Sequence, residues 1–368
     1  PVVAVIRHPH PADGEQTGTL RVCPVPREAL GDLKMTPFVE KHSFGVPTLL
    51  LKPEGWTLEP PEVLRLFEKI KNSGQPLKEV IGDVPYRGVL TGLNEAFFID
   101  QATRDRLIAE DPKCKPLIKK LLRGRNIQRW TAEWDKEWLI ALPSSHNREW
   151  PWTKMTDDEA KAEKVFAKEF PTLHAHFKPM EAALRKREDQ GKFWWELRAC
   201  DYYDKFEEPK IIYQEIQTYS WFALDQEGYY LNNKAFFIPT GDIYLLALLN
   251  SPLMWWFLSR YLPHMINETL TPVAFLMEKC PVASPSKAAR DSIEDRAGRL
   301  VELAKSLAQK QATFLQWVAH ETGIAKVPSS LETPWQLQPD GFLGELKKAG
   351  LKRATPATLQ HLTQTFER

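Results

Sequence analysis

The longest apolar run in the sequence, at residues 243–262, most restricts the folds that this chain can adopt. A membrane-spanning helix needs about 20 mostly apolar residues, but the run IYLLALLNSPLMWWFLSRYL contains Asn250, two serines, Pro252 and Arg260. We therefore expect a buried helix with a break at the proline, inside a globular core, and no membrane partner. The composition agrees, because 43% of the 368 residues are hydrophobic and 26% are charged, which is ordinary for soluble globular proteins.

The N-terminus and the cysteines point to a cytoplasmic protein. The chain does not open with a charged leader followed by an apolar stretch, so we expect no signal peptide. Four widely spaced cysteines without a Cys-x-x-Cys pair favour a reducing cytoplasm over a disulfide framework or a zinc site. The first residue is Pro rather than Met, and we interpret the sequence as a piece of a longer protein.

In the first third of the chain, short apolar segments and turn residues predict mixed strands and helices. Strands are expected in residues 1–60, including one in 47–53, because β-branched or Leu-rich stretches alternate with Pro, Gly and Asp. Residues 60–72 are predicted to form a helix with Pro near its start, and residues 101–111 a helix capped by Thr103.

The remaining two thirds continue this α+β pattern. Residues 157–187 have a helical pattern broken at Pro171 and Pro179, residues 209–216 alternate as a strand, and residues 220–239 suggest a hairpin. A long amphipathic helix is predicted from about residue 288 to 320, followed by a small helical C-terminal segment. The fold class is therefore expected to be α+β.

A basic segment at residues 113–130 is the first candidate site. It holds seven Lys or Arg residues and no Asp or Glu, although the whole chain has 49 basic and 48 acidic residues. Pro116 and the apolar spacing that follows predict a helix here, with Lys119, Lys120 and Arg123 away from its apolar stripe. Such a cluster repels itself unless an anion binds, so we expect a footprint for phosphates, with a solvated surface face as the alternative.

A second candidate lies in RKREDQGKFWWELR, residues 185–198. Basic residues around Trp194 and Trp195 are compatible with a surface that stacks bases and contacts phosphates. An aromatic pair in the core below a charged helix end explains the same pattern equally well. The sequence leaves both interpretations open.

Three motifs typical of enzymes are only partly present in this sequence. An amine methyltransferase needs a loop such as Asn-Pro-Pro-Tyr, and the nearest string, residues 250–253, lacks the second Pro and the aromatic residue. Pro339, Asp340, Glu345 and Lys347 hold nuclease-type residues, but their spacing is too tight for two adjacent strands. His174 and His176, two residues apart on a helix, point to different faces. We therefore expect no catalytic residue, no metal site and no cofactor in this chain.

Five segments in order resemble a known family. They are GVLTGLNEAFFID, DPKCKPLIKKLLRGRNIQRW, PKIIYQEI, YYLNNKAFFIP and IYLLALLNSPL. Together they are similar, over roughly residues 80–283, to the C-terminal target-recognition (specificity) domain of TaqI-like N6-adenine DNA methyltransferases. The same domain occurs in fused type IIG (Eco57I-like) restriction–modification enzymes.

The resemblance also suggests a division of the chain. Residues 1–60 would be end strands of a methyltransferase catalytic domain, residues 61–283 the target-recognition domain, residues 284–330 a helical connector and residues 331–368 a small helical segment. Thr91, Gly92, Asn94, Gly124 and other positions match the family's motifs, and the two glycines are expected to be backbone necessities. The expected DNA-binding residues are Lys119, Lys120, Arg123, Arg125, Arg129, Trp130, Arg198, Tyr213, Gln214, Asn233 and Lys234.

The resemblance implies a bacterial protein that binds double-stranded DNA specifically and presents a flipped adenine to a catalytic domain outside this chain. Arg pairs with guanine and Gln with adenine in the major groove, so Arg123, Arg125, Arg129 and Gln214 would read bases. The expected partners are duplex DNA and the N-terminal methyltransferase domain of the same parent, which would use S-adenosylmethionine. The alternatives are a metal-dependent nuclease fragment and a protein-interaction module of a defence system.

Overall fold

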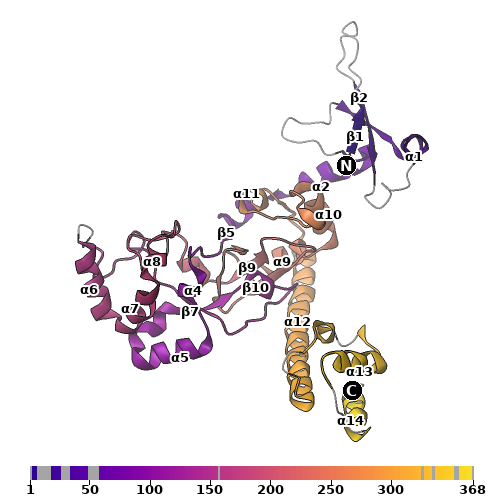
Figure 1. The fold of residues 1–368 in the computed structure, drawn as a ribbon. Coiled ribbons are helices and arrows are strands. Elements are labelled where there is room, and N and C mark those ends of the chain that lie inside the picture. Colours follow the sequence, from indigo (N-terminus) through magenta and orange to yellow (C-terminus); the bar gives the residue numbers. More distant parts are fainter. Residues whose placement is uncertain are drawn as a thin grey trace.

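A computed structural model describes residues 2–5, 18–25, 34–48, 58–155, 158–324, 327–333, 336–351 and 356–366. In Figure 1 a small N-terminal sheet, a central body and a long helix with a small helical unit at its far end follow one another along the chain. Small sheets and many helices confirm the expected α+β class. Among the described helices, none is long and apolar enough to cross a membrane.

The N-terminal sheet is antiparallel with the order β1-β2-β3. Its strands are β1 (Val2–Val5), β2 (Thr19–Pro24) and β3 (Phe44–Pro47), with α1 (Met35–His42) between the last two. Leu20, Val22 and Val46 pack with Leu64 of α2 (Pro61–Lys71), the helix predicted at residues 60–72. The strand predicted at 47–53 lies mostly outside the described residues, and β3 ends at Pro47.

The central body contains two four-stranded sheets. The first, antiparallel throughout, has the order β10-β9-β12-β5 and comprises β10 (Phe222–Asp225), β9 (Lys210–Gln214), β12 (Ala235–Ile238) and β5 (Tyr86–Arg87). The second has the order β11-β7-β8-β6 and comprises β11 (Tyr230–Leu231), β7 (Ile118–Leu122), β8 (Trp138–Ile140) and β6 (Phe98–Ile99).

The first sheet separates two hydrophobic cores. Ile212 and Phe237 face a core shared with the second sheet and with α4 (Asn94–Phe97), α5 (Gln101–Glu110), α6 (Glu159–Glu169), α7 (Pro171–Phe177) and α8 (Glu181–Leu184). Ile211 and Phe236, one residue earlier in each strand, face a second core with α9 (Ile243–Leu249) and α10 (Pro252–Tyr261). Alternation along a strand therefore covers both faces of this sheet.

The apolar run of residues 243–262 forms α9 and α10, and the predicted break at Pro252 is confirmed. The Ser251 side chain accepts a hydrogen bond from the Met254 amide and so caps α10. Asn250 is fully buried, where it accepts from the Phe222 amide at 3.2 Å and donates to the Phe222 carbonyl at 2.8 Å. The break thus anchors both helices to β10.

Small elements complete the region next to α10. These are β4 (Gln75–Pro76), which pairs with β13 (Pro281–Val282), α3 (Leu77–Ile81) and α11 (Ala274–Met277). The long helix α12 (Lys287–Thr322) follows, and its far end packs with α13 (Pro339–Lys348) and α14 (Pro356–Phe366) around Val318 and Phe342.

Three local predictions are wrong. Residues 116–123 do not form a helix, because Pro112–Leu117 is a 3-10 turn and β7 follows it directly. The segments at 220–239 do not form a hairpin, because β10 and β12 pair with opposite edges of β9. The cap of α5 is Asp100, whose side chain accepts from the Thr103 amide at 2.8 Å.

Candidate nucleic-acid interface

Two lysines of the basic segment, Lys119 and Lys120, lie on β7 and point to opposite faces. Lys119 pairs with Glu207 at 2.7 Å, and Lys120 pairs with Glu227 at 3.5 Å while lying over the Trp134 ring. The ion pair with Lys119 lowers the pKa of Glu207. Successive residues of a strand point apart, so Lys119 and Lys120 do not form one cluster of uncompensated charge. Acidic residues distant in the sequence pair with both of them.

A short 3-10 turn (Gly124–Asn126) follows β7, with Arg123 directly before it and Arg125 inside it. The Arg123 guanidinium donates two hydrogen bonds to the Glu137 carboxylate, at 2.6 and 2.8 Å, and this pairing raises the pKa of Arg123. Arg125 has a longer contact of 3.4 Å to Asp135, and 66% of its side chain is exposed. Arg123 is therefore held in place, whereas Arg125 is accessible to a ligand.

This turn packs tightly against the residues between β11 and β12. The Gly124 amide donates to the Asn232 side-chain oxygen at 3.1 Å. A Cβ atom at Gly124 would lie 2.4 Å from the Lys234 carbonyl oxygen, so only glycine fits there. The expectation that Gly124 is a backbone necessity is confirmed, and so is that for Gly92, which has a φ of +68°.

The end of β9 meets the same two segments. Gln214 donates to the Ile127 carbonyl at 2.6 Å. The Glu215 carboxylate accepts from Arg87 at 2.7 Å and from Lys234 at 2.8 Å, and 61% of the Lys234 side chain is exposed. The end of β9 thereby joins three other segments that are distant in sequence, at Arg87, Ile127 and Lys234.

We call this region the loop–turn surface. It consists of Arg87, Arg123, Arg125, Gln128, Gln214, Glu215, Asn233 and Lys234. Sequence reasoning missed Arg87, Gln128 and Glu215. No local signal marks Arg87, which reaches Glu215 and the Asn233 carbonyl only through the pairing of β5 with β12.

Arg129 and Trp130 connect this surface to the second core. Arg129 donates to the Asn250 carbonyl at 2.7 Å and lies over the Tyr219 ring. Trp130 has a φ of 75°, is partly buried against the second core, and donates its amide to the Phe222 carbonyl at 2.9 Å. Both residues anchor the loop in this structure.

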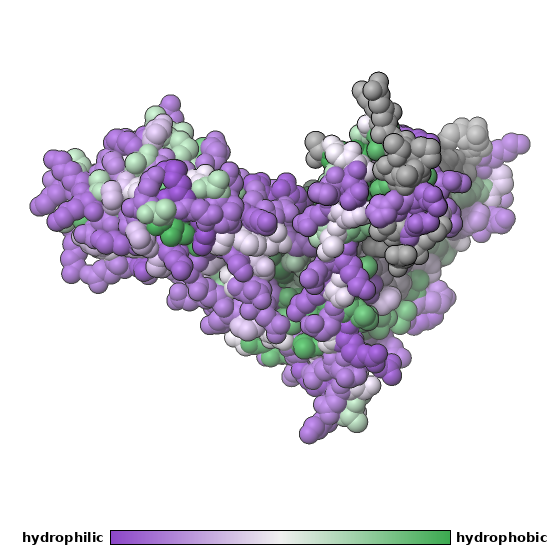
Figure 2. Space-filling model, turned by 90° about the horizontal axis from the view of Figure 1, so that it is seen from below, coloured by the Kyte–Doolittle hydropathy of each residue, from purple (hydrophilic) through white to green (hydrophobic). Residues whose placement is uncertain are grey.

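A groove of about 610 Å³ separates the loop from α12. Arg125, Gln128 and Arg129 line one wall, and Leu307 and Gln311 line the other. Seen from below (Figure 2), the surface of the molecule is mostly hydrophilic, with apolar side chains gathered toward its middle. The loop–turn surface therefore borders a groove whose opposite wall is partly apolar.

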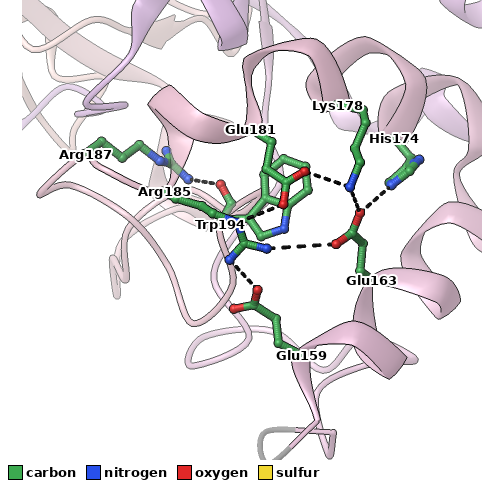
Figure 3. A network of polar contacts seen from close by, with 8 residues as sticks. All are labelled: Glu159, Glu163, His174, Lys178, Glu181, Arg185, Arg187 and Trp194. Carbon is green, nitrogen blue, oxygen red and sulfur yellow. Dashed lines mark hydrogen bonds and ion pairs between the residues drawn. The ribbon is translucent and has the colours of Figure 1, made fainter.

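The second basic segment is part of the core and of an ion-pair network (Figure 3). Trp194 and Trp195 are buried, and Arg185 pairs with Glu159 of α6 and with Glu181, four residues earlier on α8. Buried Arg187 donates to the carbonyls of Thr91 and Trp194 at 2.7 and 2.9 Å. The structure supports the core interpretation of the two tryptophans, and Arg198 pairs with Asp189 at 3.0 Å.

Tyr213 must be removed from the expected DNA contacts. It is fully buried in the centre of the first sheet, stacked on Phe236, and burial raises its pKa well above the usual value. Both faces of β9 are covered, so a residue of this strand reaches the surface only at an end, as Gln214 does.

The residues weighed for enzyme chemistry have other partners. Glu345 accepts a hydrogen bond from Ser330 at 2.6 Å and pairs with Lys348. Asp340 lies on the same helix, α13. His174 contacts Glu163, and His176 contacts the Ala96 carbonyl, each at 2.9 Å. In the described part of the chain, no three His, Cys, Asp or Glu side chains are grouped as metal ligands.

Two known protein families match separate parts of the chain. Residues 119–282 match the TaqI-like C-terminal specificity domain, and residues 286–368 match a domain of unknown function (DUF8810). Among solved structures, the chain is similar to the type IIL restriction-modification enzyme MmeI in complex with DNA, at 13% identity and a TM-score of 0.44. That match covers 80% of this chain but only 36% of the other. No curated protein matches the sequence.

Proposed function

We propose that this chain, whose residues 119–282 form a TaqI-like C-terminal specificity domain, binds duplex DNA and reads a short base sequence for a restriction–modification enzyme. The match to the specificity domain is the observation that carries the proposal. In its finer form, the parent enzyme is a type IIG N6-adenine methyltransferase. The DNA contacts made here would help to offset the few kcal/mol needed to flip an adenine toward a catalytic domain outside this chain.

The loop–turn surface supports the proposal because its side chains are suited to DNA. Arg125 and Lys234 are exposed, and each is held by a surface ion pair. Such pairs contribute only about 0–1 kcal/mol, so a phosphate or a guanine edge can replace the carboxylate. Arg125 and Gln214 would read bases and Lys234 would contact a phosphate, while Glu137 and Glu215 hold their neighbours in position.

The methyl donor and the catalytic partner belong to the parent enzyme in this proposal. S-adenosylmethionine would bind to a methyltransferase domain on the N-terminal side, and the present chain would supply sequence recognition and orientation of the duplex. Lys119 and Lys120 face opposite sides of β7, so the two cannot both contact one duplex segment at this surface.

The test is a binding selection from a pool of random duplexes, followed by titration of the enriched duplex at several salt concentrations. We expect one enriched sequence, and a slope of log affinity against log salt between about −2 and −4, as for two to four phosphate contacts. The double variant Arg125→Ala/Lys234→Ala should weaken binding by about 1–3 kcal/mol per lost contact. The matched control is Arg65→Ala/Lys154→Ala, which removes two exposed cations from other regions.

Equal binding by the two double variants would refute the placement of the interface. The absence of any enriched sequence would refute the proposed function. Cleavage of duplex DNA by the chain with Mg²⁺ would favour the nuclease alternative.

One observation favours a second function, protein interaction through α12. Leu300, Leu303 and Leu307 are exposed along one side of this helix, at the spacing of an apolar stripe. Replacement of all three by Ser should then abolish capture of a protein partner without changing DNA affinity. If DNA affinity changes instead, this stripe contributes to DNA binding in the groove between the loop and α12.

A further inference from the structure

A short loop after α10, residues 263–269, carries large apolar side chains at its tip. Ile266 is 84% exposed and Met265 is 50% exposed. Single exposed aliphatic residues are common on protein surfaces. Here two adjacent ones are exposed in the same short loop. The loop therefore presents an apolar point to whatever approaches it.

The loop is held rigidly by its own hydrogen bonds. The Met265 amide donates to the Thr269 carbonyl at 2.7 Å, and the Thr269 hydroxyl donates to the Ile266 carbonyl at 3.0 Å. Asn267 and Glu268 have φ values of 60° and 56°, a conformation that costs free energy in residues other than glycine. A strained, cross-braced loop keeps its tip in one position and loses little conformational entropy on binding.

The base of the loop is attached to the strand that ends at the loop–turn surface. Leu270 and Gln217 exchange two backbone hydrogen bonds, at 2.8 and 2.9 Å. Gln217 lies three residues beyond Gln214, and the intervening Ile216 is 45% exposed. The base of the loop is thus joined to the segment that directly follows the edge proposed to read bases.

The charges around the tip are compatible with DNA. Glu268 is the acidic residue of the loop, and His264 pairs with it at 2.7 Å while contacting the Ser259 carbonyl at 2.6 Å. Both contacts raise the pKa of His264, which favours the charged form and neutralises the carboxylate. Arg260, at the end of α10, adds a positive charge nearby, although it is paired with Glu59 at 3.2 Å.

We propose that Ile266, supported by Met265, is a wedge that enters between two stacked base pairs of the bound duplex. This inference rests on the proposed function. Proteins that deform DNA insert Ile, Met, Leu or Phe at a base step and partly unstack it, at a cost of a few kcal/mol. An apolar, rigid tip beside a polar reading edge has this form, and the resulting unstacking would lower the cost of extruding a base.

The experiment uses the whole chain and the duplex enriched by the selection described above, with 2-aminopurine replacing each adenine in turn. Fluorescence of 2-aminopurine rises when the base loses its stacking neighbours. We expect a rise at one base step with the parent, and a rise about fivefold smaller with Met265→Ser/Ile266→Ser, because Ser cannot fill the step. Ile266→Leu should restore the signal, and the salt slope should be the same for all variants because phosphate contacts are unchanged.

The matched control is Leu66→Ser/Val80→Ser, which removes two exposed aliphatic side chains from α2 and α3 and should leave the fluorescence as in the parent. The wedge is refuted if the parent binds its sequence without unstacking any base, or if Met265→Ser/Ile266→Ser unstacks it equally well. A tip that instead covers a protein surface would give this second result. If no sequence is enriched at all, the proposed function fails together with the wedge.

Discussion

The buried ion pair between Lys210 and Asp225 offers a demanding test of how the first sheet is held together. Both side chains have no exposed surface, and the two charged groups are 2.5 Å apart. Lys210 also donates to the Phe206 carbonyl, and the Asp225 carboxylate accepts from the amides of Glu227 and Tyr229 at 2.8 and 3.0 Å. The pair links the start of β9 to the end of β10, so the perturbations are Lys210→Met, Asp225→Asn and the two combined.

Removal of one partner from a buried pair costs about 3–5 kcal/mol of unfolding free energy, because the other charge stays buried without compensation. The cost of Asp225→Asn should lie near the upper end of this range, because the variant leaves the Lys210 ammonium group without its carboxylate and weakens the hydrogen bond from Tyr229. The cost of Lys210→Met should lie near the lower end of this range, because two backbone amides still donate hydrogen bonds to the Asp225 carboxylate. The combined variant should cost about 2–3 kcal/mol less than the sum of the single variants.

The cost of Asp225→Asn should also depend on pH. Burial lowers the pKa of Lys210, and Asp225 opposes that effect. Without Asp225, the folded-state pKa falls further below the unfolded value, so the folded state binds fewer protons between the two values. Stability then rises with pH in that window, and the deficit of the variant should shrink between neutral pH and pH values around 10.

The assay is urea unfolding combined with hydrogen–deuterium exchange of peptides that cover β9, β10 and β12. Exchange is needed because 13 tryptophans distributed over the chain average any fluorescence signal. Single variants that each cost less than about 1 kcal/mol, as exposed pairs do, would refute the reasoning. Strictly additive costs would refute it as well.

Three further predictions concern single positions. Gly124→Ala should destabilise the protein by about 1–3 kcal/mol in urea unfolding and weaken DNA binding, because its Cβ would meet the Lys234 carbonyl, whereas Gly298→Ala, with open space around it, should be neutral or stabilising. Burial lowers the pKa of His176, so the unfolded state binds a proton before the folded state does as the pH falls below about 6.5. The melting temperature of the parent should therefore fall as the pH is lowered further, and that of His176→Gln should fall less. Glu268→Gln should lower the pKa of His264 measured by NMR titration, because the carboxylate helps to raise it; an unchanged pKa would mean that the pair is not formed in solution.

Local signals in the sequence were enough for elements whose ends are set by nearby residues. The break between α9 and α10 follows from Ser251 and Pro252, and α2 and α12 follow from amphipathic spacing with Pro or Ser at their starts. The segment at 117–122 was misassigned because its apolar residues satisfy a helical spacing as well as a strand buried on both faces. Only pairing with β8 and β11 decides between the two.

The candidate site was less predictable because its chemistry depends on long-range pairs. The basic segment contains no acidic residue, yet Glu137, Glu207 and Glu227 reach its cations after folding. Tyr213 and Gln214 are neighbours in the sequence, but the first is buried in the second core and the second reaches the surface where the strand ends. Charge counted along a chain therefore does not predict charge displayed on a surface.

The helix α12 connects the central body to the small helical unit and fixes the distance between them. Arg290, Ile293 and Val301 in its first half contact the central body, while Val318 near its end belongs to the core of the small helical unit. Its 36 residues span about 54 Å at 1.5 Å per residue. Deletion of one residue between the two contact regions would rotate the small helical unit by about 100° about the helix axis and bring it about 1.5 Å closer to the central body. The number of residues in α12 therefore determines the direction that the small helical unit faces.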